Sequence, residues 1–246
     1  AGAAAVMPLA APIGSGLAPG SGAAGWVRDT AMRFFTGRSI RAGERQRSAA
    51  RHGIGLPARD PGPRRRLIAT LPALEVSRPD WPEEAVIVGP MLFEPTDVVL
   101  APPPGDGPLI VVAPSTAATG APGLAELALE QLVPGRTLPE GSRLVVSRLG
   151  GDHHPVPPWA AVGFGRQDEL LSHADLVICG GGHGMLAKAL LAGVPAVAVP
   201  GGGDQWELAN RVVRQGSARL VRPLTPEALA AAANAVISEP SYRDAA

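Results

Sequence analysis

Short apolar runs alternate with amphipathic stretches from residue 109 to the end of the chain. The runs have little polar alternation, which is typical of strands buried on both faces, and the stretches between them repeat apolar residues at helical spacing. Strands separated by helices predict a parallel sheet in a doubly wound α/β domain, whose ligands bind at the carboxyl ends of the strands. The predicted strands are 109–113, 144–147, 160–164, 176–179, 196–199 and 218–221, and the predicted helices are 124–132, 168–172, 183–192, 205–215 and 226–237.

The first part of the chain has a different pattern. Residues 1–25 are interpreted as a loop, and residues 26–51 as a basic helix or helix pair with Trp26, Met32, Phe34, Phe35 and Ile40 as its apolar contacts. Apolar runs at 67–74 and 85–88, each bounded by Pro or Gly, predict two strands of a small sheet. Residues 94–108 have the composition of a linker, with three consecutive prolines. The predicted division is therefore 1–93, a linker at 94–108, and 109–246.

Composition and charge narrow the class of protein. The chain has 31 Gly and 27 Pro without a regular period, which excludes collagen, and 46% hydrophobic residues, which excludes a wholly disordered chain. Residues 1–66 hold 11 Arg against 3 acidic residues, a net charge of +8, so the remaining residues carry −8 and the two parts belong to different structural units. Lys188 is the only Lys beside many Arg and Ala, which indicates a GC-rich, actinobacterial-type coding sequence.

The single cysteine, Cys179, excludes an intramolecular disulfide framework and a cysteine-based zinc site, and it favours a reducing cytoplasm. Residues 1–24 are apolar but are interrupted by Gly and Pro without a preceding basic stretch, so they predict neither a signal peptide nor a spanning helix. Because the chain starts without Met, in loop-like composition, we expect it to be a fragment.

The most informative segment for a binding site is residues 175–185. It consists of an apolar strand, the glycines Gly180-Gly181-Gly182 and the start of a helix. Glycines permit a sharp turn, and the backbone N–H groups and positive dipole of a helix N-terminus attract phosphate. The segment is neither a Walker motif nor a clean GxGxxG fingerprint. By itself it predicts either a phosphate or diphosphate site or an ordinary tight turn between a strand and a helix.

Together with the segments around it, this loop resembles the donor-binding signature of the GT-B UDP-glycosyltransferase-like family, the macrolide and natural-product glycosyltransferases. The resemblance rests on the glycine loop, Gly-Val-Pro at 193–195 and the run from Pro200 through Asp204-Gln205 to Asn210. Phe164 to Leu171 is similar to the segment that lies against the nucleobase in that family, and Ser115-Thr116 to its first phosphate-facing turn. Residues 51–57 and 85–90 resemble the closing part of its acceptor domain.

The resemblance implies a Rossmann-like donor domain preceded by the tail of a second Rossmann-like domain. It implies transfer of a sugar from a UDP- or TDP-sugar to a hydroxyl of a small hydrophobic or lipid acceptor, with inversion, without metal and without a cofactor. The family's general base would lie upstream, so no catalytic residue is expected in this chain. The residues that the resemblance places against the donor are Ser115, Thr116, Phe164, Gly165, Arg166, Gln167, Gly180, Gly181, Gly182, His183, Gly184, Met185, Lys188, Asp204 and Gln205.

The sequence departs from the family pattern at four of these positions. Gly180 stands where a His is common and Met185 where a Thr is common, so an imidazole and a hydroxyl are lost. Lys188 stands where Glu is frequent, and Arg166 replaces the usual Pro. Backbone N–H groups and the helix dipole remain for the donor, and Lys188 would add a positive charge if it turned toward the diphosphate.

Several of the other residues have a second interpretation. His183 is either a phosphate or sugar ligand or a helix-capping residue, and Asp204 is either a partner of sugar hydroxyls, with Gln205, or a helix N-cap. Phe164 either stacks on the base or is a buried residue at a strand end. Trp206 is interpreted as a packing residue. His153-His154 lack a nearby third ligand, which argues against a metal site.

The function has alternatives as well. One is a non-catalytic nucleotide-sugar-binding module, or a donor subunit that needs a separate acceptor chain. Another is a different GT-B enzyme, such as a nucleotide-sugar epimerase or a lipid-linked N-acetylglucosaminyl transferase. The arginine-rich residues 28–66 form either a solvated face or a surface that attracts an anionic membrane. We expect a cytoplasmic protein, which in the second case would bind peripherally to the inner face of the membrane. Nucleic acid is not an expected partner, because no recognised motif accompanies the arginines. The sequence makes no prediction of oligomeric state.

Overall fold

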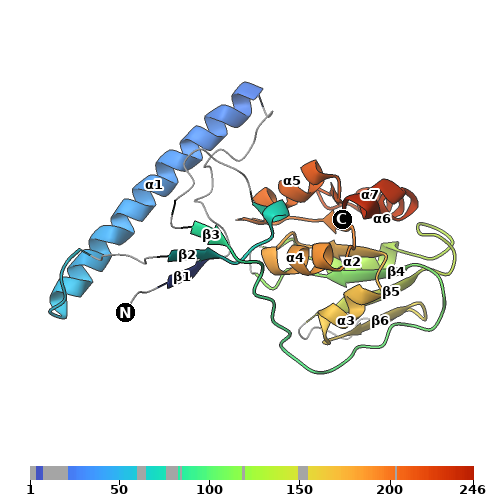
Figure 1. Cartoon of the computed structure of the whole chain (residues 1–246). Helices are drawn as coiled ribbons and strands as arrows, with labels where there is room; N and C mark the ends of the chain where they lie inside the picture. The colour runs from blue at the N-terminus through green and yellow to red at the C-terminus, as the bar shows by residue number, and fades with distance from the viewer. Residues whose placement is uncertain are drawn as a thin grey trace. The chain divides into compact units, whose positions relative to one another are not determined.

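The chain divides into two compact units, residues 1–91 and 92–246 (Figure 1). The computed structural model describes residues 4–7, 22–59, 65–75, 83, 85–117, 120–148, 155–202 and 204–246. His153 and His154 lie outside these residues, so the prediction made for them stays a prediction.

The first unit contains one long helix and a small parallel sheet. Strands β1 (Ala4–Met7), β2 (Arg65–Ile68) and β3 (Ala85–Ile87) pair in that order, and the helix α1 covers Gly22–Gly53. The loop predicted over residues 1–25 is therefore wrong where β1 forms and where α1 begins.

Two other predictions for this unit need correction. The strand predicted over residues 67–74 stops at Ile68, where the N–H of Thr70 turns back to the Ile68 carbonyl, and Pro72 then starts a 3-10 helix, η1 (Pro72–Leu74). The predicted apolar contacts of α1 are not found at Phe34, Phe35 and Ile40, whose side chains are exposed. The first two instead form an edge-to-face ring pair with each other.

The second unit is the predicted doubly wound domain. Its six strands are all parallel and lie in the order β6-β5-β4-β7-β8-β9. All of its elements except the last helix, α7 (Pro240–Ala245), were predicted from the sequence. The elements are β4 (Leu109–Ala113), α2 (Leu124–Gln131), β5 (Arg143–Ser147), β6 (Ala160–Gly163), α3 (Gln167–Ser172), β7 (Leu176–Cys179), α4 (His183–Leu191), β8 (Ala196–Ala198), α5 (Gln205–Gln215), β9 (Ala218–Leu220), α6 (Pro226–Ser238) and α7 (Pro240–Ala245).

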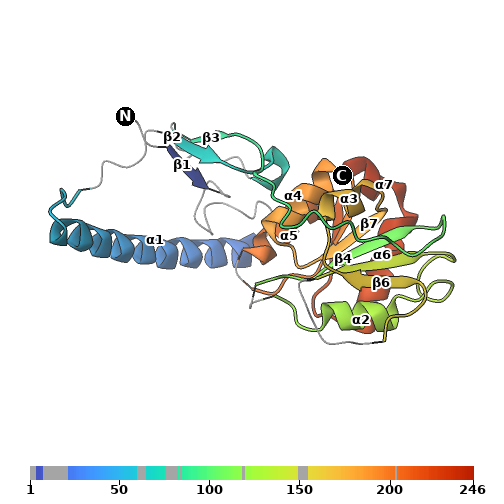
Figure 2. The same ribbon diagram turned by 90° about the horizontal axis from the view of Figure 1, so that it is seen from below.

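The core of this unit lies on both faces of the sheet. The register aligns Val146, Val112, Ile178 and Val197 in one row across four strands, and all four belong to the apolar cluster shared with α2 and α6. Figure 2 shows α3, α4 and α5 on the other side of the sheet. Burial on both faces explains why these strands carry almost no polar residue.

The chain order reverses beside β4, whose neighbours are β5 on one side and β7 on the other. In open parallel sheets, ligands bind at the carboxyl ends of the strands where this reversal occurs. Here the loops after β4 and β7 begin with Pro114 and Gly180, so this topology brings the two phosphate-facing turns predicted from the sequence to one edge of the sheet.

Residues 92–100, which we call the strap, lie along the second unit. The N–H group of Arg166 donates to the carbonyl oxygen of Val98 over 2.8 Å. A Cβ atom at Gly165 would come within 2.7 Å of the Leu100 side chain, so glycine permits this close approach. Residues 94–108, whose composition predicts a linker, belong to the second compact unit in the structure.

Candidate donor-binding site

A cavity of about 540 Å³ opens at the carboxyl ends of β4, β5 and β6. It is of the size that small-molecule sites usually have. Among the residues predicted to contact a donor, five line it: Ser115, Thr116, Phe164, Gln167 and Lys188. Five more lining residues were not singled out from the sequence: Phe93, Pro95, Pro114, Ser147 and Arg148. Ser147 ends the predicted strand 144–147 and Arg148 directly follows it, so their position at a strand end would have found them.

The glycine loop adjoins this cavity through Ser115. Gly180 is buried, and a Cβ atom on it would lie 2.8 Å from the Cβ of Ser115. Gly181 has a φ of 75°, a left-handed conformation that favours glycine. These two glycines therefore let the loops after β4 and β7 come together at the point where the sheet order reverses.

The helix α4 begins at His183, and Gly182 occupies its N-cap position. Since glycine has no side chain, no side chain caps this end of the helix. The first turn of such a helix carries N–H groups without intrahelical partners and the positive end of the helix dipole. Gly182 and Gly184 have open space where a side chain would be. His183 and Met185 are half-buried in this turn. This arrangement suits an anion such as a diphosphate.

Gln205 ties two loops together. Its Nε2 donates to Ser115 Oγ over 2.8 Å, and its Oε1 accepts from the N–H of Gly201 over 3.0 Å. The side chain is buried, at 5% exposure. Gln205 therefore joins the turn after β4 to the turn after β8, although the resemblance placed it against sugar hydroxyls.

Asp204, its neighbour, has an exposed side chain and occupies the N-cap position of α5 without capping the helix through that side chain. Asp204 therefore has the N-cap position that the alternative from the sequence expected, but its side chain makes no capping hydrogen bond. Trp206 is half-buried beneath the guanidinium of Arg222, which lies 4.9 Å from the ring centre. Asn210 Nδ2 donates to the carbonyl of Trp206 over 2.7 Å, within the same helix.

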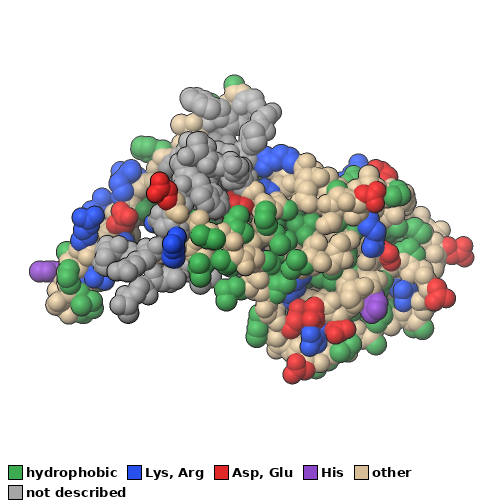
Figure 3. Space-filling view, in the orientation of Figure 1, with side chains coloured by type: hydrophobic (Ala, Val, Ile, Leu, Met, Phe, Trp, Pro, Cys, Tyr) green, Lys and Arg blue, Asp and Glu red, His purple; other side chains and the backbone are tan. Residues whose placement is uncertain are grey.

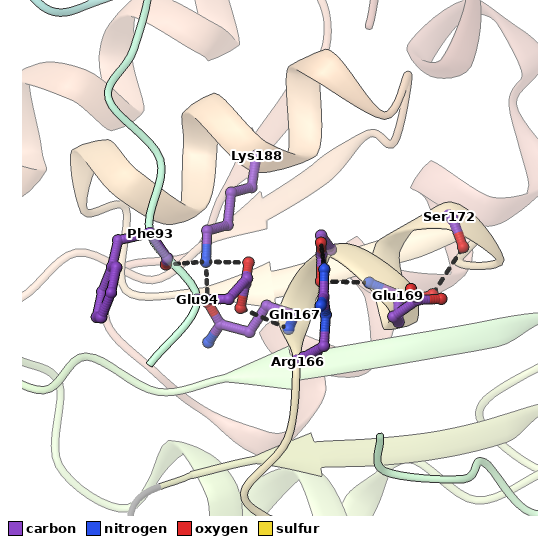
Figure 4. Close-up of polar contacts among 8 residues, drawn as sticks. Phe93, Glu94, Arg166, Gln167, Glu169, Ser172 and Lys188 are labelled. Atoms are coloured by element: carbon purple, nitrogen blue, oxygen red, sulfur yellow. Dashed lines mark hydrogen bonds and ion pairs between the residues drawn. The ribbon is translucent and has the colours of Figure 1, made fainter. Parts of the chain in front are cut away.

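Lys188 forms the most buried charged contact of the cavity wall (Figure 4). Its ammonium pairs with Glu94 over 2.5 Å, and the two side chains are 8% and 16% exposed. The same nitrogen donates to the carbonyl of Phe93 and to Oε1 of Gln167, both over 3.1 Å. Glu94 in turn accepts from the N–H of Gln167 over 2.9 Å. These acceptors match the three protons of the ammonium, so its charge holds the strap to α3 and α4.

The second cation of the cavity wall is paired as well. Arg148 donates to Glu126 of α2 over 2.8 Å. Since both Arg148 and Lys188 are matched by carboxylates, an anionic ligand would depend largely on hydroxyl and backbone N–H donors, which Ser115, Thr116 and the first turn of α4 supply.

Arg166 lies at the start of α3 and pairs with the carboxylate of Asp168. This hydrogen bond lowers the pKa of Asp168. A proline at this position, usual in the family, would lack the N–H group that Arg166 gives to Val98.

Cys179 ends β7 and is fully buried, which raises its pKa to about 11. A thiol with such a pKa remains protonated at neutral pH and is a poor nucleophile.

The described residues contain no group of three or more His, Cys, Asp and Glu side chains arranged to hold a metal ion. Among the same residues, no helix is both long and apolar enough to cross a membrane. Figure 3 shows basic side chains spaced along α1, where Arg38, Arg41, Arg45 and Arg47 are exposed.

Comparisons with known proteins agree with the resemblance seen in the sequence. Residues 157–246 match the glycosyltransferase family 28 C-terminal domain. The 4'-demethylrebeccamycin synthase of Lentzea aerocolonigenes is 31% identical over 253 aligned residues, which span 95% of this chain and 58% of that protein.

Solved structures share the fold. The kitacinnamycin glycotransferase has a TM-score of 0.67 and 26% identity, and the match covers 83% of this chain and 55% of that one. The spinosyn rhamnosyltransferase SpnG complexed with thymidine diphosphate has a TM-score of 0.56 and 23% identity over 75% of this chain and 51% of that one. Residues 157–246 therefore match a glycosyltransferase family 28 C-terminal domain, and the chain as a whole is similar to natural-product glycosyltransferases in sequence and in fold. It spans little more than half the length of these relatives.

Proposed function

We propose that this chain is the donor-binding part of a glycosyltransferase, which moves a sugar from a nucleoside diphosphate to a hydroxyl of a small-molecule acceptor. The observation that carries the proposal is the cavity at the carboxyl ends of β4, β5 and β6, beside the open first turn of α4. The homology to 4'-demethylrebeccamycin synthase supports the class of reaction. The structural neighbour complexed with thymidine diphosphate supports TDP, besides UDP, as a donor nucleotide to test.

In the proposed reaction, the acceptor oxygen attacks the anomeric carbon with inversion while the bond from that carbon to the diphosphate oxygen breaks. The proton of the acceptor hydroxyl goes to a general base, which we do not assign to this chain. The diphosphate leaves with increased negative charge. Fixed N–H dipoles at Gly182–Met185 and the hydroxyls of Ser115 and Thr116 would stabilise that charge as it develops. This assignment requires no metal ion, so EDTA should leave nucleotide binding unchanged.

Calorimetric titration with TDP and with UDP tests the proposal. Gly182 has a φ of −70° and open space around it, so Gly182→Trp should fold normally and fill the approach to α4. Gly43→Trp is the matched control, because Gly43 is an exposed position of α1 that also has open space. We expect the wild-type chain and Gly43→Trp to bind one of the nucleotides and Gly182→Trp to lose at least tenfold in affinity. Wild-type chain that binds neither nucleotide at millimolar concentration would contradict the proposal.

We also propose that the exposed arginines of α1 give the protein a weak affinity for anionic membranes. Cosedimentation with vesicles of increasing anionic lipid content tests this, since electrostatic binding should rise with that content and fall with salt. Binding that is absent or independent of lipid charge would contradict it.

A further inference from the structure

Phe93 is an apolar side chain held out in solvent at the edge of the cavity. It is 76% exposed, and yet it is one of the residues that line the cavity. An exposed phenylalanine costs little by itself, and many proteins have one. The unusual feature of Phe93 is that its backbone is fixed by buried charge.

Two contacts fix that backbone. The carbonyl oxygen of Phe93 accepts from the ammonium of Lys188 over 3.1 Å, and the next residue, Glu94, forms the buried ion pair with the same ammonium. Figure 4 shows the Phe93 ring beyond these contacts, extending away from Lys188 and Glu94. The strap therefore presents this ring from a rigid attachment, and a ligand that packs against it would lose little further conformational entropy.

A second ring reaches the same cavity from another element. Phe164 directly follows β6 and lines the cavity together with Phe93. Gln167, at the start of α3, also lines it and is held by Lys188. Two aromatic side chains and a fixed amide form a wall suited to a planar heteroaromatic ring with polar edges.

We infer that Phe93 is a binding residue for the nucleobase of the donor, which it contacts through the face of its ring, and that Lys188 and Glu94 are the positioning residues that hold it there. The inference rests on the proposed function, because it names the part of the nucleoside diphosphate that the strap recognises. It also gives Lys188 a role other than contact with the diphosphate.

The test is TDP affinity, measured by calorimetry, for substitutions at Phe93. When an aromatic side chain that stacks on a base is replaced by alanine, the affinity typically falls by about tenfold. We expect Phe93→Ala and Phe93→Leu to lose about tenfold and Phe93→Trp to keep wild-type affinity, because only tryptophan retains an aromatic face. Val99→Ala, at a strap residue that is 63% exposed and does not line the cavity, should bind as wild type.

The role of Lys188 is tested in the same assay by a double-mutant cycle. Lys188→Met should weaken TDP binding, and Phe93→Ala should add little to that loss, since the ring would no longer be held in place. A folded Lys188→Met variant in which Phe93→Ala still costs the full tenfold would overturn the positioning role.

The role of Phe93 is tested by the Phe93 substitutions alone, so the test remains valid even if Lys188→Met does not fold. Equal affinity of wild type, Phe93→Ala and Phe93→Leu would overturn the inference and leave the proposed function intact. Retained affinity in Phe93→Leu alone would also overturn it, by showing that apolar bulk is sufficient. Wild-type chain that binds neither TDP nor UDP would overturn both.

Discussion

Gly180 lies so close to Ser115 that a Cβ atom added to it would be 2.8 Å from the Ser115 Cβ. Real Cβ atoms essentially never approach another heavy atom so closely, and the Ser115 Cβ is attached directly to the backbone. The contact leaves no room for a side chain at position 180. In this chain the place where a histidine is common is closed by the turn after β4.

Gly180→Ala should therefore destabilise the second unit by about 1–3 kcal/mol, the usual cost of overpacking a well-packed site. Gly184→Ala is the matched control, because Gly184 is an exposed helical position with open space. Alanine there should stabilise the chain by about 0.5–1 kcal/mol through its higher helix propensity. Urea denaturation of both variants measures the difference.

The same clash predicts a rescue. Ser115→Gly removes the atom that Gly180→Ala would meet, and also the hydroxyl that accepts from Gln205. Gly180→Ala should therefore cost much less in the Ser115→Gly background than in the wild type. If the two effects simply add, the contact is not the cause of the destabilisation.

Gln205→Ala removes both hydrogen bonds that join the turns after β4 and β8. Since each such bond contributes on the order of 1 kcal/mol, we expect a loss of about 1–3 kcal/mol in the free energy of unfolding. Gln215→Ala, at an exposed position of the same helix, removes only an exposed hydrogen bond to the carbonyl of Ala245 and should cost less than about 0.5 kcal/mol. Equal effects of the two substitutions would show that the Gln205 contacts are not structural.

Glu94→Gln removes one charge of the buried pair with Lys188. Because an uncompensated buried charge remains, the expected loss is about 3 kcal/mol. The ion pair of Arg243 and Asp175 is a useful comparison, since its side chains are 49% and 46% exposed. Arg243→Ala should cost less than about 1 kcal/mol. Thermal or urea unfolding that ranks the two variants in the opposite order would contradict the structural role of the Glu94 pair.

Cys179 should resist alkylation while the chain is folded. Burial raises its pKa from 9.0 to about 11, so at pH 8 iodoacetamide should react slowly in native buffer and rapidly in urea. The raised pKa also means that its contribution to stability is fully present below pH 9 and is lost as the pH rises through about 11. Cys179→Ala should lack this part of the alkaline destabilisation. Fast alkylation of the folded chain would contradict the burial.

Much of the second unit could be predicted from the sequence because its strands are buried on both faces. In a chain that alternates strands with helices, an apolar run such as Leu176–Cys179 predicts a buried strand, and the glycines after it predict a turn. β1 could not be predicted in the same way. It is four residues long, and it is recognisable as a strand only through its pairing with β2, which is distant in the sequence.

The candidate site was predicted only in part, for a related reason. Motif position identified Ser115 and Phe164, which follow strand ends and line the cavity. It could not show that Lys188 pairs with Glu94, because that contact joins residues 94 positions apart across a segment with linker composition. Nor could it show that Gln205 uses both ends of its amide within the protein, which depends on the meeting of two loops.

Amide hydrogen exchange of the chain with and without TDP tests most directly whether the donor nucleotide binds at the carboxyl ends of the central strands. We expect saturating TDP to slow exchange in peptides covering 114–117 and 180–188, with a smaller effect at 164–167, and to leave α1 and α6 unchanged. Unchanged exchange in the first two segments at saturating TDP, or protection confined to another part of the chain, would contradict it.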